Sequence, residues 1–160
     1  MMNKKVYFFL VVIVWSISGC TTCGGFNKEK ELQAIASLLQ QERKAHFDRN
    51  TELFVLEFAD SMLSVNKGKV SVASPDENKK RISSYFGSVQ FIKWDDSAAP
   101  IIRFSDDGSL AYAIVQKQVI LIRPDSLGKL LTDTTDYAWA SIYRKEKEGW
   151  KIECNVSTNK

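Results

Sequence analysis

This chain has 160 residues, of which 44% are hydrophobic, with 22 basic and 19 acidic side chains and a single histidine. The charges are scattered and, beyond two lysines near the N-terminus, almost balanced, which excludes the basic surface of a nucleic-acid-binding protein. One histidine and three cysteines cannot assemble a zinc or iron centre, and no phosphate-binding glycine loop is present. We therefore expect no nucleic acid, no metal and no cofactor.

The first nineteen residues have the three parts of a secretory signal. Residues 1–5 are basic, residues 6–15 form an unbroken apolar run, and residues 16–19 are small. The apolar run is too short to span a bilayer, which needs about 20 residues. The segment that follows this run, Ile17-Ser18-Gly19-Cys20, resembles the lipobox of bacterial lipoproteins. The resemblance implies that residues 1–19 are removed and that Cys20 is lipidated; a cleaved signal with an incidental cysteine is the alternative.

Lipid on Cys20 would attach the protein to a membrane of the bacterial cell envelope, and Thr21 favours the outer membrane over the inner one. Residues 20–26 are short and rich in glycine, which predicts a flexible tether. Cys23 in this tether could pair with Cys154 in an oxidising compartment. The alternative for Cys154 is a small, buried residue in a strand.

The first predicted element after the tether is an amphipathic helix of about twenty residues that Asn27 can cap. Leu32, Ile35, Leu39 and His46 form one stripe at helical spacing, and lysine, glutamine, glutamate and arginine fill the other face. Asn50 can cap a short second helix.

Alternating residues 58–65 and 70–72 around a turn at 66–69 then predict a hairpin. Ser74, Pro75 and Glu77 mark the start of another helix, which Gly87 can end. The rest of the chain reads as strands at 89–94, 101–104, 110–122, 127–143 and 150–156. Turns at 105–108 and 145–149 join some of these strands, and Asp95-Asp96 is interpreted as part of another turn.

Helices followed by long strands predict an α+β domain over residues 27–160, with helices packed on one face of a curved antiparallel sheet that forms a cone. The element order, with Phe58-Ala59-Asp60, residues 105–112, Tyr137-Ala138-Trp139 and residues 149–152, resembles the nuclear-transport-factor-2-like (NTF2-like) superfamily. The closest likeness is to its SnoaL-like and DUF4440 branch. The resemblance implies a pocket at the wide end of the cone and frequent homodimers through the sheet.

The same superfamily hosts isomerases, cyclases, dehydratases and transport factors, so membership supplies no function. Isomerase-like members carry a carboxylate base near the end of the first strand, where this chain has Ser64-Val65-Asn66. An amide cannot take a proton from carbon, which counts against a ketosteroid isomerase reaction. Asp60 could substitute for the base only if its side chain points inward.

The candidate pocket is rich in aromatic side chains with a few polar groups. Its residues are His46, Asp60, Tyr85, Trp94, Arg103, Tyr112, Gln116 and Trp139. Alternatively, the aromatic residues serve only to pack the core and an interface. For His46 we favour a position in the core without a catalytic role. No residue is assigned a catalytic role.

Three functions remain open from the sequence. The first is a lipid-anchored envelope protein whose non-catalytic domain binds a small apolar ligand or an envelope partner. The second is an interaction or dimerisation module without a ligand. The third is a SnoaL-like isomerase or cyclase.

Overall fold

A computed structural model describes residues 26–159. The signal, Cys20 and Cys23 therefore lie outside the described residues. The helices are α1 (Lys28–Asp48), α2 (Thr51–Val55) and α3 (Pro75–Ser88). The strands are β1 (Phe58–Asn66), β2 (Lys69–Ala73), β3 (Gln90–Phe104), β4 (Leu110–Pro124), β5 (Leu130–Glu146) and β6 (Gly149–Asn159). Within this range, no helix is both long and apolar enough to cross a bilayer.

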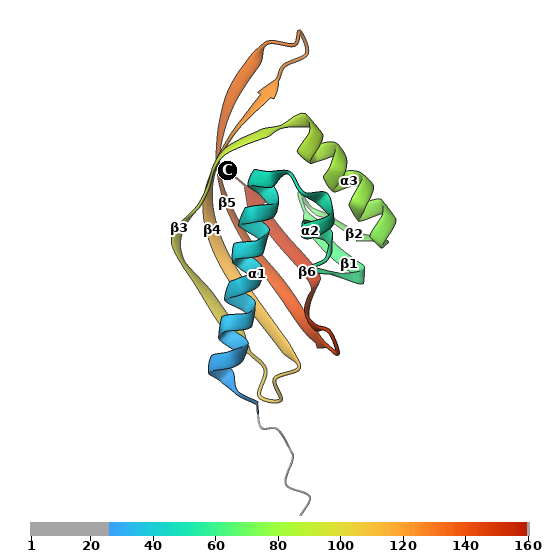
Figure 1. Cartoon of the computed structure of the whole chain (residues 1–160), viewed down its shortest axis with the longest axis vertical. Helices are drawn as coiled ribbons and strands as arrows, with labels where there is room; N and C mark the ends of the chain where they lie inside the picture. The colour runs from blue at the N-terminus through green and yellow to red at the C-terminus, as the bar shows by residue number, and fades with distance from the viewer. Residues whose placement is uncertain (1–25, 160) are drawn as a thin grey trace, which may run out of the picture.

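The six strands form one curved sheet in the order β2-β1-β6-β5-β4-β3, and the helices lie on its concave side (Figure 1). Four of the five neighbouring pairs are antiparallel, whereas β1 and β6 run parallel. The expectation of a wholly antiparallel sheet is therefore wrong for this pair. β1 of the β1–β2 hairpin lies beside β6, the last strand of the chain. No short turn connects these two strands, so their relative direction is set by the path of the whole chain.

The predicted helix starts are confirmed by their caps. The side chain of Asn27 accepts a hydrogen bond from the backbone N–H of Lys30 at 3.1 Å, and Asn50 caps α2 in the same way. Ser74 and Glu77 form the expected capping box at the start of α3. The end of α3 differs from the prediction, because the helix continues through Gly87 to Ser88.

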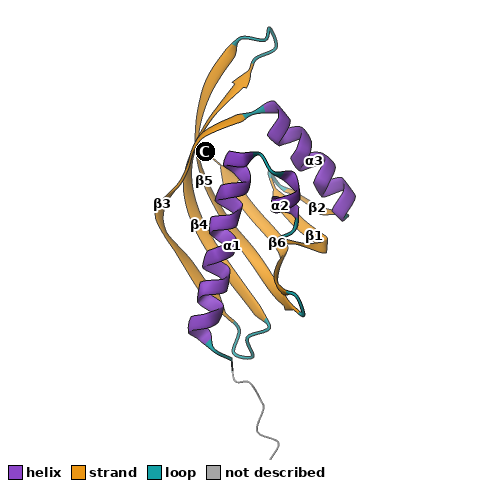
Figure 2. Ribbon diagram, in the orientation of Figure 1, coloured by secondary structure: helices purple, strands orange, loops and turns teal. Residues whose placement is uncertain are grey.

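β3 is a single long strand where the sequence predicted two (Figure 2). Its pairing with β4 is interrupted by irregularities around Lys93 and Ala98, and Pro100 is tolerated because β3 is an edge strand. Asp95 and Asp96, interpreted as turn residues, lie inside this strand and face Gln118 and Lys117 of β4. That interpretation is wrong.

The two faces of the sheet differ along β4. Its concave side presents buried residues at every second position, and these are Ala111, Ala113, Val115, Lys117, Val119 and Leu121. The residues between them lie on the convex side. α1 crosses the concave face and buries Ile35, Leu39, Ala45 and His46 against it (Figure 1). Beyond the start of β3, β4 and β5 continue as an arm, and Leu127 in its turn is 91% exposed.

Candidate ligand-binding site on the concave face

The C-terminal half of α1 carries His46 into an aromatic cluster, which we define as His46, Phe86, Phe91, Trp94 and Trp139. The imidazole stacks on the Trp94 ring with centroids 3.6 Å apart and meets Phe86 and Phe91 edge-on. Its Nδ1 is 2.7 Å from the carbonyl oxygen of Glu42. Burial is the main cause that lowers the pKa of His46 to about 4, and the nearby charge of Lys117 lowers it further. His46 is therefore a neutral residue of the core.

Four of the eight predicted pocket residues come together here. His46, Trp94 and Trp139 belong to the aromatic cluster, in which the two indole rings are 5.9 Å apart. Tyr85 of α3 packs at the edge of the cluster, 5.7 Å from the Phe91 ring, and its burial raises the pKa of the phenol to about 12. These rings fill the space between α1, α3 and the sheet.

The other four predicted pocket residues lie elsewhere and are exposed. Asp60 of β1 is exposed and lines a surface hollow together with Pro75 and Lys151, so it is not one of the buried groups of the interior. Arg103 and Tyr112 face each other across β3 and β4 on the convex side, where Gln116 also lies. The strict alternation of β4, with Ala111, Ala113 and Val115 inward, sends Tyr112 and Gln116 outward.

A second part of the concave face is polar, and we name it the polar row: Ser64, Ser141, Asn155 and Ser157. Asn155 of β6 is paired with Ser64 of β1 and Ser141 of β5, so these three side chains cross three adjacent strands. The hydroxyl of Ser141 donates to Oδ1 of Asn155 at 2.9 Å. Ser157 follows two residues later on the same face of β6, opposite Trp139. The concave face thus has an aromatic part and a polar part.

Two buried glutamates face this interior. Glu57, between α2 and β1, is 2% exposed, and its Oε1 has no hydrogen-bond partner among the described residues. Burial first, and then the charge of Glu42, raise the pKa of Glu57 to about 9. Glu42 of α1 is 6% exposed, and burial raises its pKa to about 7. At neutral pH the carboxyl of Glu57 is therefore protonated, and it can donate as well as accept a hydrogen bond.

The buried lysine of this interior already has a partner. Lys117 of β4 is 2% exposed, and its Nζ is 2.5 Å from Oδ1 of Asp96 on the neighbouring strand. Its charge also lowers the pKa of Glu42, although burial outweighs that effect. Nε1 of Trp94, like Oε1 of Glu57, lacks a partner in the described part of the chain. Since buried polar atoms are normally hydrogen-bonded, both atoms have an unused hydrogen-bonding capacity in the interior.

Glu42, Glu57 and Lys117 were missed in the sequence, although two of them carried a signal. Glu42 falls on the stripe of Leu39 and His46, three residues after the first and four before the second. Lys117 occupies an inward position of an alternating strand, between Val115 and Val119. Glu57 lies in the short connection between α2 and β1, where no periodicity exists to place it.

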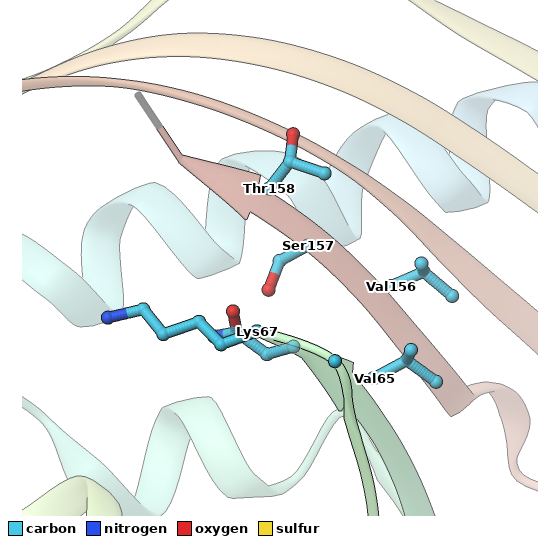
Figure 3. A pocket seen from close by; sticks show the side chains of 7 residues that line it. Val65, Lys67, Val156, Ser157 and Thr158 are labelled. Carbon is cyan, nitrogen blue, oxygen red and sulfur yellow. The ribbon is translucent and has the colours of Figure 1, made fainter.

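A hollow of about 410 Å³ opens where the polar row reaches the rim of the sheet (Figure 3). The β1–β2 turn forms one wall with Asn66, Lys67 and Gly68, and the end of β6 forms the other. Val65 and Val156 lie side by side in it, as register partners of the parallel pair. Ser157 of the polar row and the convex-side pair Val65 and Val156 line the hollow together, so it lies at the edge between the two faces of the sheet.

The described residues include no candidate metal site, and they do not test the proposed disulfide. Between residues 26 and 159, no three His, Cys, Asp or Glu side chains lie close enough together to hold a metal ion. Cys154 is half-buried in β6, opposite Ile142. Because Cys23 is outside the described range, its pairing with Cys154 stays a prediction.

Comparison with solved structures identifies the fold. An NTF2-like superfamily protein from Salmonella enterica serovar Typhimurium matches with a TM-score of 0.68 at 15% identity, covering 82% of this chain and 92% of that one. A ketosteroid isomerase-like protein from Erwinia carotovora atroseptica matches with a TM-score of 0.63 at 17% identity, covering 84% and 98%.

An NTF2-like protein with a cystatin-like fold from Novosphingobium aromaticivorans gives a TM-score of 0.59 at 11% identity, covering 81% of each chain. No family model matches the sequence, and no curated protein is similar to it. Identities this low establish the fold alone. The α+β cone predicted from the sequence is confirmed: the chain has the NTF2-like fold.

Proposed function

We propose that this chain is a lipid-anchored protein of the bacterial cell envelope whose NTF2-like domain binds a small ligand on the concave face without catalysing a reaction. The observation that carries the binding proposal is the buried, unpartnered carboxyl oxygen of Glu57 in an interior that also has a polar row. A bound molecule with an apolar body and one polar group would satisfy that oxygen and pack against the aromatic cluster.

The binding proposal is favoured over catalysis by two features. Ser64 and Asn66 occupy the region where isomerase-like relatives carry their base, and neither side chain is a carboxylate. His46 is enclosed by aromatic rings and has a lowered pKa, so it is a poor proton acceptor at neutral pH. The isomerase or cyclase of the SnoaL-like branch is the alternative, and the raised pKa of Glu57 is the observation that favours it.

A ligand screen by thermal shift tests the binding proposal. Purified protein is mixed with steroids, fatty acids and aromatic metabolites, and selective stabilisation by one class is expected. Glu57→Gln should weaken the response to that class, whereas Gln116→Ala on the convex face should leave it unchanged. If no class of compound stabilises the protein, the binding proposal is contradicted. If the protein converts a stabilising compound into a product, it is an enzyme instead.

The envelope location rests on the sequence of residues 1–20, where a basic head and an apolar run precede Ile17-Ser18-Gly19-Cys20. Metabolic labelling with a palmitate analogue should tag the wild type, and Cys20→Ala should remove the tag. Cys154→Ala serves as the matched control and should keep it. An unlabelled wild type would overturn the anchor without affecting the ligand screen.

The convex face supports the proposal of a homodimer or an interaction module. Ile101, Tyr112, Ile114 and Val156 are each more than one third exposed, and all four lie on this side of the sheet. Analytical ultracentrifugation of the wild type should show a dimer, and Ile114→Glu should dissociate it. A monomeric wild type at tens of micromolar would reject dimerisation through this face.

A further inference from the structure

A second hollow, separate from the one at the β1–β2 turn, lies against the N-terminal half of α1. It has a volume of about 330 Å³ and is bounded by α1, the end of α2 and the β5–β6 turn. Ala34, Leu38, Leu56 and Trp150 form its apolar part. Leu56 is 61% exposed, so its side chain is accessible at the edge of the hollow.

Three lysines line the same hollow: Lys30, Lys145 and Lys151. Two glutamates, Glu31 and Glu148, also line it, which leaves one net positive charge. The carboxylate of Glu31 is already engaged, because it accepts from the Trp150 indole at 2.7 Å and pairs with Lys145. These contacts, led by the hydrogen bond from Lys145, lower the pKa of Glu31, so it stays ionised at neutral pH.

Two of the three lysines, Lys145 and Lys151, are held in place by their surroundings. The ammonium of Lys145 lies 5.2 Å from the Trp150 ring centroid and is paired with Glu31, which is 8% exposed. The ammonium of Lys151 donates to the backbone carbonyl of Leu56. An ammonium has three donors, so each lysine keeps hydrogen-bonding capacity for a further acceptor. The hollow thus combines an apolar wall with fixed cationic groups.

The hollow lies at the end of the domain where the chain enters it. Lys30 and Glu31 belong to the first turn of α1, and Phe26 just before that helix packs on Phe104 with ring centroids 5.4 Å apart (Figure 1). Phe26 lies six positions after Cys20, and an extended chain of that length spans about 20 Å. A lipid on Cys20 would therefore keep this end close to the bilayer surface.

We propose that this hollow binds the anionic headgroup of a membrane lipid. A phosphodiester carries a single negative charge, which neutralises the excess charge of the hollow, and its oxygens match the lysine donors. The apolar side chains Leu38 and Leu56 are suited to the glycerol and first acyl carbons of the same lipid. The closeness of the hollow to the membrane rests on the proposed lipidation of Cys20, whereas its charge and shape do not.

Vesicle binding of the mature chain, residues 20–160 produced without lipid, tests the proposal independently of the anchor. Vesicles of phosphatidylcholine are compared with vesicles in which part of that lipid is replaced by phosphatidylglycerol. We expect sedimentation with the anionic vesicles only, together with protection of Lys30, Lys145 and Lys151 from acetylation. Equal binding to both vesicles, or protection spread evenly over all lysines, would overturn the headgroup site.

Matched variants separate the hollow from general charge attraction. Lys30→Gln, in the hollow, should weaken partition into the anionic vesicles about fivefold, as expected for one basic residue near an anionic surface. Lys28→Gln, on the same helical turn but outside the hollow, should cause a smaller loss. Identical losses would reject the site. Protection of the three lysines by inorganic phosphate alone, without added effect of the vesicles, would identify a free anion instead of a lipid.

Discussion

The aromatic cluster and the polar row occupy the same concave face but are built differently. In the aromatic cluster, rings from α1, α3, β3 and β5 pack directly on one another, and His46 is enclosed among them. In the polar row, small polar side chains lie on β1, β5 and β6, and elsewhere in the interior the buried carboxyl of Glu57 has an oxygen without a partner among the described residues. The aromatic cluster therefore stabilises the cone, whereas the polar row leaves hydrogen-bonding groups for a ligand.

The largest effect is expected from Trp94→Ala in the aromatic cluster. Trp94 is 7% exposed and contacts His46, Phe91 and Trp139, so its removal leaves a large cavity. The free energy of unfolding should fall by about 3–5 kcal/mol, measured by urea denaturation. Leu127→Ala in the exposed arm is the control and should change it by less than about 0.5 kcal/mol. Equal losses in both variants would contradict the assignment of stability to the cluster.

Asp96→Asn should have the next largest effect. It leaves the ammonium of Lys117 buried without a charged partner, which should cost about 2–3 kcal/mol because Asp96 itself is partly exposed. Asp95→Asn is a matched control on the adjacent residue, since it breaks an exposed ion pair with Arg43 that is worth about 0–1 kcal/mol. Thermal or urea unfolding of the two variants measures the difference, and a larger loss for Asp95→Asn would refute it.

The two buried glutamates predict a stability that decreases as the pH rises. Glu57 and Glu42 have pKa values raised to about 9 and about 7, so the folded state holds protons that the unfolded state has released. His46, with a lowered pKa of about 4, acts in the opposite direction below pH 6.5. Between about pH 6.5 and 9 the glutamates contribute most of the pH dependence, and the free energy of unfolding should fall by about 1 kcal/mol per pH unit.

Glu57→Gln sharpens this pH prediction, because glutamine keeps the shape of the side chain without the titrating proton. The variant should unfold at nearly the same urea concentration across that pH window. Glu148→Gln, in the β5–β6 turn, is the control and should retain the slope of the wild type. A wild type whose stability rises from pH 6.5 to 9 would show that Glu57 is ionised in the fold.

The smallest effect is expected in the polar row. Ser141→Ala removes the hydroxyl that donates to Asn155, which should cost about 1 kcal/mol of stability. The same variant should weaken the thermal shift caused by a ligand from the screen. Ser126→Ala in the arm turn serves as the comparison and should affect neither measurement. Unchanged ligand response in Ser141→Ala would place the ligand away from the polar row.

Local signals made most of the elements predictable from the sequence. Asn27, Asn50 and the Ser74–Glu77 capping box mark helix starts because a cap depends on residues at most three positions apart. The alternation within 137–143 likewise placed its aromatic residues on one face. Local patterns do not say which face is buried, so Tyr112 and Gln116 were expected in a pocket and lie on the convex side.

Features set by distant partners could not be predicted in this way. Asp96 resembles a turn residue until Lys117 is seen on the neighbouring strand. Glu57 is buried only because α1 and the sheet close over it, and charged side chains are normally expected at the surface. The helices and strands can therefore be predicted from local sequence patterns, whereas the candidate site depends on the tertiary arrangement.

The parallel pairing of β1 with β6 has a consequence for the order in which the chain folds. The first strand of the sheet can acquire this neighbour only after the last strand has been synthesised, and the Glu31–Trp150 hydrogen bond likewise joins residues 119 positions apart. Contacts so distant in sequence form slowly. Late closure suits the export proposed for this chain, since an open polypeptide can pass through a narrow translocation pore and a completed cone cannot.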